Sequence, residues 1–518
     1  MRMIRIITLV AVISSAAWCL ARQPELIATS LSFEVTVAKG LLAAPQDGRV
    51  LVVLGGRSFK EPVRFIGETG MDVPSMLGQD VRAFGPGKTV VLDRRCAIFP
   101  IDDLSRLKAG DYHVQAVFDY NRDLRLPNAP ENLVSAPVRV AIDPAKGGTA
   151  KLELTFKLPP DQPPKGTEQV KLLKFRSEKL SKFFGRPMYL RAGVILPAGH
   201  AKETDRKYPL RVLIGGYGSR YESVLRMMNP LSEFSREWNA DSAPRMILLH
   251  LDGAGPFGDP YQVNSANNGP YGDAVTEELI PYVEKTYRGI GKGYARVLEG
   301  ASTGGWVSLA LQIFYPDFFN GTWSHCPDPV DFRAFELINI YEDDNAYVNR
   351  FGFERPAARE INGETRYTMR HEVQREIVLG RGNRWTLSGK DWGAWNAVFG
   401  PRGPDGLPAP LWDGKTGKID RKVTKHWQQY DLCLRLQKYA AVLAPKLRGK
   451  LHIWVGDADT YFLNNAVDLL DDFLKKAHPS FDAKITFGRH GDHNWRELSE
   501  KEMVQQMADA IEKAKPGR

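Results

Sequence analysis

Cysteine is scarce in this chain of 518 residues, and its four cysteines lie far apart. They are Cys19, Cys96, Cys326 and Cys433, and none belongs to a Cys-x-x-Cys motif or to a His/Cys cluster with zinc-ligand spacing. If an N-terminal signal containing Cys19 is removed, three remain, so at most one internal disulfide can form. The scarcity excludes a disulfide-rich scaffold and argues against a structural zinc site.

Long hydrophobic runs are missing beyond the N-terminus, so no later segment predicts a membrane-spanning helix. Clusters of basic residues are missing too: the formal net charge is +9, but Lys and Arg are scattered along the chain. Scattered basic residues are typical of a solvated surface. We therefore expect no nucleic-acid partner and no stable membrane insertion. The 43% of hydrophobic residues is enough for sizeable globular cores.

The first 21 residues are typical of an export signal. Arg2 and Arg5 precede an apolar run over residues 6–17, which is too short for a comfortable membrane span. Cleavage after the small residue Ala21 would complete the pattern. We expect a periplasmic or extracellular protein, with an uncleaved anchor as the alternative.

A pattern of short strands, separated by Gly, Pro and Asp, extends over residues 28–158. Expected strands are residues 33–38, 50–54, 89–92, 112–118, 138–142 and 151–156. This spacing predicts a small antiparallel sandwich. The segment before Tyr112 resembles the tyrosine corner of immunoglobulin-like sandwiches. Because no catalytic constellation falls here, we expect a packing or substrate-positioning module, followed by a Pro-rich linker at residues 159–166.

Strands and helices alternate over residues 167–518, which predicts an α/β fold with a parallel sheet covered on both faces. Expected strands are residues 189–196, 210–214, 246–251, 295–298, 321–324, 451–455 and 484–487. Expected helices are residues 231–238, 274–287, 306–314 and 465–476. A long insertion between the last strands, residues 327–450, is rich in aromatic residues. We interpret it as a lid or substrate-binding subdomain, with a structural embellishment as the alternative.

The sequence Gly300-Ala301-Ser302-Thr303-Gly304 joins an expected strand to an expected helix. A serine on such a sharp turn needs small neighbours, because a Cβ two residues away on either side would clash. The helix N-terminus would lie under an oxyanion, where the N–H of Thr303 can donate to it. Ser302 is therefore the predicted nucleophile.

A serine nucleophile requires a histidine base and a carboxylate that orients the histidine. In an α/β hydrolase they follow in the order Ser, Asp/Glu, His. Asp459 and His493 satisfy this order, since each follows one of the last two expected strands. The alternatives for the acid are Asp457, Asp328 and Asp331, and the alternative for the base is His490. His325 follows a strand and could line the site, whereas we interpret His250, within an apolar strand, as a core histidine.

A second oxyanion donor is expected in the loop that follows the strand at residues 210–214. That loop is rich in glycine, which allows backbone N–H groups to converge on an anion. The candidates are the N–H groups of Tyr217 and Gly216.

Several motifs together resemble the putative-esterase family of α/β hydrolases, which includes S-formylglutathione hydrolase, feruloyl and acetylxylan esterases, and enterochelin esterase. They are Gly300-Ala301-Ser302-Thr303-Gly304-Gly305, Gly456-x-x-Asp459-x-x-Phe462, Gly491-x-His493-x-Trp495 and the run from Gly272 to Arg288. A β-sandwich ahead of the hydrolase also resembles the enterochelin-esterase architecture. The insertion after Pro327 is far longer than in the small family members.

The resemblance implies a secreted serine hydrolase that cleaves a carboxylic ester through an acyl-enzyme on Ser302, without a metal or organic cofactor. The expected partner is a small-molecule or carbohydrate ester; carbohydrate, aryl and siderophore esters are all open. An acyltransferase or a peptidase would use the same triad. A non-catalytic carbohydrate-binding protein is a further alternative, since aromatic residues of the insertion would stack on sugar rings. The acidic run from Glu342 to Asn345 is interpreted as a solvated loop rather than a calcium site.

Overall fold

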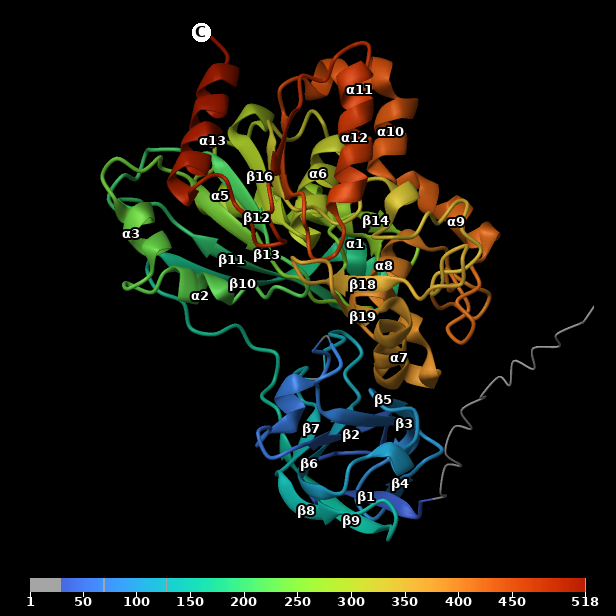
Figure 1. Ribbon diagram of the computed structural model, residues 1–518. Helices are drawn as coiled ribbons and strands as arrows, with labels where there is room; N and C mark the ends of the chain where they lie inside the picture. Colours follow the sequence, from blue (N-terminus) through green and yellow to red (C-terminus); the bar gives the residue numbers. More distant parts are fainter. Residues whose placement is uncertain (1–28, 69, 127, 518) are drawn as a thin grey trace, which may run out of the picture.

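The computed structural model describes residues 29–68, 70–126 and 128–517, arranged as a β-sheet lobe and a larger α/β lobe (Figure 1). The expected export signal lies outside the described residues. Among the described residues, no helix combines the length and apolar character needed to cross a bilayer. Cys96, Cys326 and Cys433, the cysteines within the described ranges, form no disulfide with one another.

The β lobe has nine strands in one hydrogen-bonded sheet with its own apolar core. They are β1 (Leu31–Val37), β2 (Gln46–Gly55), β3 (Ser75–Phe84), β4 (Thr89–Leu92), β5 (Ala97–Phe99), β6 (Gly110–Asp119), β7 (Leu133–Ser135), β8 (Val138–Ile142) and β9 (Gly148–Lys157). The expectation of a purely antiparallel sandwich is wrong at one edge, because β1 pairs with β9 in parallel. The tyrosine-corner contact exists: the Tyr112 hydroxyl donates to the Lys108 carbonyl at 2.7 Å.

The α/β lobe is built on an eight-stranded sheet of order β10-β11-β13-β12-β16-β17-β20-β21. Its strands are β10 (Val170–Ser177), β11 (Met188–Ile195), β12 (Leu210–Ile214), β13 (Ile247–Leu251), β16 (Arg296–Ala301), β17 (Thr322–His325), β20 (Leu451–Gly456) and β21 (Lys484–Gly488). The pairs β10–β11 and β11–β13 are antiparallel, and every pair from β13 to β21 is parallel. All parallel strands therefore end at the same edge.

Helices cover both faces of this sheet, as the buried strand pattern predicts. The larger core contains α1 (Glu178–Phe184), the run from α4 (Tyr271–Asp273) through η3 (Ala274–Leu279) to α5 (Ile280–Thr286), α6 (Thr303–Phe314) and α12 (Asn464–Lys476). The second core, on the other face, contains α2 (Ser223–Met227), α3 (Glu233–Asn239) and α13 (Glu500–Ala514). The predicted α/β class is thus confirmed.

The insertion, residues 327–450, is a folded subdomain that continues the larger core. It contains η5 (Phe332–Ala334), the hairpin β18 (Pro356–Arg359) and β19 (Thr365–Thr368), α7 (Met369–Leu379), η7 (Trp385–Leu387), α8 (Asp391–Phe399), α9 (Arg421–Trp427), α10 (Leu432–Lys438) and α11 (Ala440–Leu447). Its tryptophans are buried, and Trp385 and Trp412 stack on each other, whereas Phe351 and Phe353 are exposed. Burial of the tryptophans weighs against a sugar-stacking platform built from them.

Helix α7 lies where the insertion meets the β lobe (Figure 1). Val378 and Leu379, at its end, pack against the β-lobe side chains Leu51 and Met76. The buried Arg49 of β2 donates to the Val378 carbonyl at 2.7 Å. The β lobe therefore supports the insertion through an apolar contact and a buried cation.

Candidate active site

Ser302 lies on the turn between β16 and α6, with a φ of 57° and a ψ of −124°. This conformation is sparsely populated for a residue with a side chain, and such strain is characteristic of functional sites. The flanking glycines are sterically required. A Cβ on Gly300 would lie 2.1 Å from the Gly304 carbonyl oxygen, and one on Gly304 would lie 2.0 Å from that of Ile214. The clash expected from the sequence is therefore real, and the turn is held between neighbouring strands.

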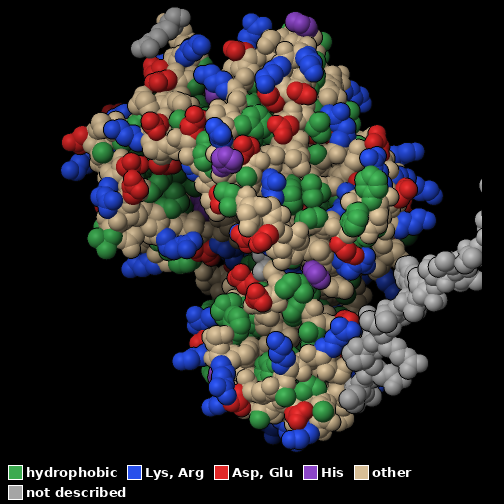
Figure 2. Space-filling view, in the orientation of Figure 1, with side chains coloured by type: hydrophobic (Ala, Val, Ile, Leu, Met, Phe, Trp, Pro, Cys, Tyr) green, Lys and Arg blue, Asp and Glu red, His purple; other side chains and the backbone are tan. Residues whose placement is uncertain are grey.

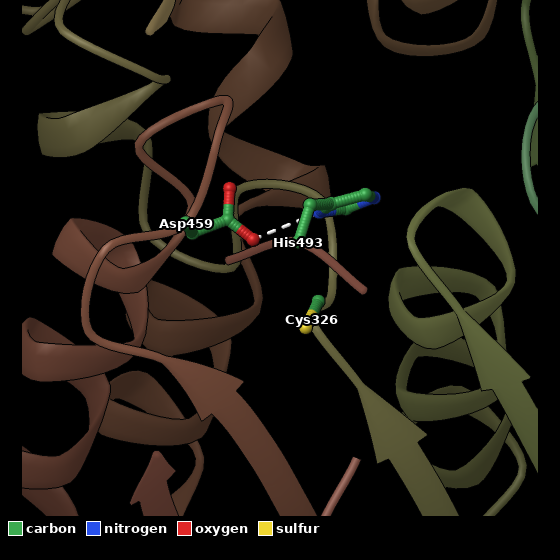
Figure 3. A group of neighbouring side chains, drawn as sticks. All are labelled: Cys326, Asp459 and His493. Atoms are coloured by element: carbon green, nitrogen blue, oxygen red, sulfur yellow. Dashed lines mark hydrogen bonds and ion pairs between the residues drawn. The ribbon is translucent and has the colours of Figure 1, made fainter. Parts of the chain in front are cut away.

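Asp459 and His493 meet at the edge where β20 and β21 end (Figure 3). The Nδ1 atom of His493 lies 2.8 Å from Oδ2 of Asp459. The other Asp459 oxygen accepts the N–H of Tyr461 at 2.8 Å, and the side chain is fully buried. A buried carboxylate fixed in this way orients the imidazole and leaves Nε2 free for proton transfer.

Two backbone hydrogen bonds hold the acid loop against the base loop. The N–H of Asp457 donates to the Gly488 carbonyl, and that of Ala458 donates to the Gly491 carbonyl, both at 3.0 Å. The insertion adds a third contact, since Arg359 of β18 donates to the Asp459 carbonyl at 3.0 Å. The position of Asp459 therefore depends on three segments of the chain.

The alternative acids and bases lie elsewhere. His490 is exposed at a positive φ of 53°. His250 is buried between the hydroxyls of Ser219 and Ser223, and burial lowers its pKa to about 4. His325 stacks on Trp454, and it does not line the cavity that contains Ser302.

The remaining acid candidates do not contact His493 either. Asp331 pairs with Arg333, and Asp457 contacts the base loop through its backbone. Asp328 has a different position, next to Ser302, with its Oδ1 3.5 Å from the Ser302 Oγ. No hydrogen bond joins Ser302 to His493 in the part of the chain that the structure describes, but such bonds are often long before substrate binds.

Asp328 is fully buried among hydroxyl and indole donors. Tyr261 donates to it at 2.5 Å, Thr303 at 2.9 Å and Trp395 at 3.3 Å. Burial raises its pKa to about 6. The network ties the first turn of α6 to α8 of the insertion, so it positions the nucleophile turn against the rest of the cavity.

The oxyanion candidates lie beside the nucleophile. A Cβ on Gly216 would lie 3.8 Å from the Ser302 Cβ, so the loop after β12 passes directly alongside. The N–H of Gly218 donates to Asp259 at 3.2 Å, and the Tyr217 hydroxyl donates to the Gly389 carbonyl at 2.8 Å. The loop is therefore anchored on both sides and passes beside Ser302.

Ser302 opens into a cavity of about 160 Å³. We call the part contributed by the α/β hydrolase core the hydrolase wall: Tyr217, Ser302, Thr303, Tyr461, Leu463 and His493. The insertion contributes the other part, which we call the insertion wall: Asp328, Glu336, Tyr367, Glu372, Asp391 and Trp395. Of the insertion-wall residues, the sequence motifs indicated only Asp328 as a site candidate. For the others, the one signal in the sequence is the aromatic-rich composition of the segment.

Two groups of side chains have potential ligand atoms close enough together to bind a metal ion. Cys326, Asp459 and His493 offer atoms within 4.8 Å of one another, but burial raises the pKa of the Cys326 thiol to about 11. A protonated thiol is a poor ligand. Glu372, Glu376 and Asp391 form the second group.

Protein donors already occupy the second group. Glu376 accepts the N–H groups of Trp392 and Gly393 at the start of α8, and Arg375 donates to Glu372. Glu376 uses its oxygens to cap α8, and Glu372 is paired with a guanidinium, so few carboxylate oxygens are left to ligate a metal ion. We therefore assign no metal to either group.

The family model described as "Putative esterase" matches residues 181–509, more than half of the chain. No curated protein sequence matches significantly. Similar solved structures include a ferulic acid esterase (14% identity, 67% of this chain and 98% of that chain, TM-score 0.40). An S-formylglutathione hydrolase from Agrobacterium tumefaciens is 12% identical over 68% of this chain and 97% of that chain, with a TM-score of 0.34. The enterobactin esterase of Shigella flexneri is 16% identical over 90% of this chain and 91% of that chain, with a TM-score of 0.34. On the strength of the family model, this chain belongs to the putative-esterase family of α/β hydrolases.

Proposed function

We propose that the protein is an exported serine hydrolase that cleaves a carboxylic ester through an acyl-enzyme on Ser302. One observation carries the proposal. The strained Ser302 turn lines the same cavity as His493, and the Nδ1 atom of His493 is hydrogen-bonded to the buried Asp459. A nucleophile, a base and an acid from three strand ends are the parts that acyl transfer requires.

The mechanism follows from these positions. Ser302 Oγ attacks the ester carbonyl while His493 Nε2 takes its proton, and Asp459 stabilises the imidazolium. The N–H of Thr303 and an N–H of Gly216 or Tyr217 stabilise the tetrahedral oxyanion. His493 then protonates the leaving alcohol and activates a water molecule, which releases the acyl group and regenerates the serine.

We further propose roles for the other parts of the chain. The β lobe, residues 28–158, is an immunoglobulin-like positioning module joined by the linker at residues 159–166. The insertion, residues 327–450, determines which ester reaches Ser302. Contacts support both roles, since the β lobe packs on α7 and the insertion forms half of the cavity lining.

Purified protein and a Ser302→Ala variant test the catalytic proposal with a p-nitrophenyl ester of a short fatty acid and a fluorophosphonate probe. Wild type should release p-nitrophenol and become labelled on Ser302. The variant should lose both properties, with a rate lower by several orders of magnitude. A folded Ser302→Ala protein that retains wild-type hydrolysis would refute the role of Ser302.

A further inference from the structure

The insertion wall has a charge character opposite to that of the protein. Lys and Arg side chains are spread over both lobes on the face seen in Figure 2, and the formal net charge is +9. The cavity, by contrast, is lined by four carboxyl groups and by no Lys or Arg among the described residues. The carboxyl groups are those of Asp328, Glu336, Glu372 and Asp391.

Glu336 is the least satisfied of these groups. Its side chain is buried, with 4% of the residue exposed, and its Oε2 has no hydrogen-bond partner among the described residues. A buried polar atom without a partner is costly, and one that belongs to a cavity-lining residue can be satisfied by a ligand. The backbone adopts a positive φ of 52° at this residue, an uncommon conformation for a glutamate.

The charges around Glu336 are those of other carboxyl groups. Burial, then the nearby Glu372, Asp391 and Asp328, raise its pKa well above the ordinary value. The buried Arg375 of α7 does not line the cavity; it pairs with Glu372 at 3.3 Å and Asp391 at 3.6 Å and donates to the Gly67 carbonyl. The cavity therefore gathers carboxyl groups, and among the described residues that line it Glu336 has a buried oxygen without a hydrogen-bond partner.

The other lining side chains suit a cation as well. Tyr217, Tyr367, Trp395 and Tyr461 add aromatic rings to the wall. Aromatic faces attract cations, most strongly where water is excluded. An anionic group would meet four carboxyl groups, and a plain alkyl chain would leave the Glu336 oxygen unpaired. A protonated amine offers both a charge and N–H donors.

We propose that the ester hydrolysed at Ser302 carries a protonated amine, and that Glu336 receives this ammonium group inside the cavity. The inference rests on the proposed ester hydrolysis and specifies its substrate class. Asp328, Glu372 and Asp391 line the same cavity but already have protein partners, so Glu336 is the group that pairs with the ammonium, and the aromatic rings pack against the alkyl chain of the substrate. Binding of the cation favours the ionised form of Glu336, so it is accompanied by release of a proton.

The first test compares three p-nitrophenyl esters of matched length: 6-aminohexanoate (cationic), heptanoate (neutral) and monoadipate (anionic). For wild type, kcat/KM should be about tenfold higher for the cationic ester than for the neutral one, and lowest for the anionic ester. In Glu336→Gln, the cationic-to-neutral ratio should fall about tenfold. The exposed Glu364→Gln in the same insertion is the matched control and should keep the wild-type ratio.

The second test needs no catalysis. Calorimetry with Ser302→Ala should detect binding of hexylammonium but not of hexanol, with proton release seen as a dependence of the heat on buffer. Equal binding of the two, or binding of Mg²⁺ or Ca²⁺ instead of the amine, would overturn the inference. Hydrolysis of all three esters by wild type without a preference for the cation would do so too.

The two tests separate the inference from the proposed function. Absence of hydrolysis and of fluorophosphonate labelling, together with hexylammonium binding, would refute the esterase and keep the amine site. Glu336→Asp, which keeps the charge, should show an intermediate preference. If Glu336→Gln fails to fold, the charge series on wild type and the calorimetry still decide the question.

Discussion

The hydrolase wall and the insertion wall line one cavity but draw on different parts of the fold. On the hydrolase wall, Ser302 and Thr303 begin a helix, and His493 follows the end of a parallel strand. On the insertion wall, Glu336 comes from a turn, Tyr367 from a hairpin strand, and the other residues from a loop and two helices.

The walls also differ in how their polar groups are satisfied. Asp459 accepts hydrogen bonds from His493 and from two backbone N–H groups, whereas Glu336 leaves one oxygen without a partner. A group that is fully partnered is fixed before substrate arrives, which suits catalysis. In the proposed substrate complex, the ammonium group pairs with the unpartnered Glu336 oxygen, which suits recognition. The comparison supports the proposal that the sheet edge carries the chemistry and the insertion the specificity.

The sharpest test of the hydrolase wall is Asp459→Asn, which keeps the shape but removes the charge that holds the imidazole. We expect kcat to fall on the order of 10⁴-fold, because the neutral amide favours the wrong tautomer. Steady-state kinetics with the neutral p-nitrophenyl ester measures this. Asp457→Asn on the same loop is the control, and an equal loss there would indicate a general effect of the loop.

The nucleophile turn should tolerate no side chain at Gly304. Gly304→Ala forces a Cβ to within 2.0 Å of the Ile214 carbonyl oxygen, so we expect a loss of about 3 kcal/mol in unfolding free energy. Urea denaturation measures it. Gly56→Ala has no neighbour within 4 Å of the new Cβ, so it should be nearly neutral. Similar stability of both variants would show that the turn can relax.

Asp328 joins the two walls, and its raised pKa predicts a pH effect. Burial raises that pKa from 3.8 to about 6, so the folded state holds the proton more tightly than the unfolded chain. The stabilisation is full below pH 3.8 and is lost as pH rises through 6. We therefore expect the stability of wild type minus that of Asp328→Asn to decrease by about 2 to 3 kcal/mol between pH 4 and pH 7.

Thermal or urea unfolding of both proteins at the two pH values measures this difference. Carboxyl groups distant from Asp328 titrate alike in wild type and variant, so the subtraction reports Asp328 together with its coupling to Glu336 and Asp259. A difference that stays constant or grows with pH would contradict the raised pKa.

The smallest expected effect concerns the support of the insertion wall by the β lobe. Arg49→Ala removes a buried cation that contacts Val378 and Asn383 of the insertion, and it should cost about 2 kcal/mol of unfolding free energy. Arg57→Ala removes an exposed arginine from the same lobe and should change stability by less than about 0.5 kcal/mol. If the variants behave alike, the lobes are energetically independent.

Local patterns predict the hydrolase wall because each of its parts has a short-range signature. In the α/β lobe, β12 has the predicted bounds, and the turn at Ser302 follows from its glycines. In the β lobe, β4 and β8 also have the predicted bounds. Strands with less regular patterns were missed: β3, β5, β7 and β10. The parallel pairing of β1 with β9 was missed as well, since it joins residues more than a hundred positions apart and has no local signal.

By itself, the sequence determined the α/β class, the turn that carries Ser302, and the order of nucleophile, acid and base. These follow from hydrophobic period and glycine sterics, which act within a few residues. Only the tertiary structure showed that the predicted acid Asp459 contacts His493, and that Oε2 of Glu336 has no hydrogen-bond partner among the described residues. Such contacts depend on how distant segments pack, and burial then decides which carboxyl groups keep their protons.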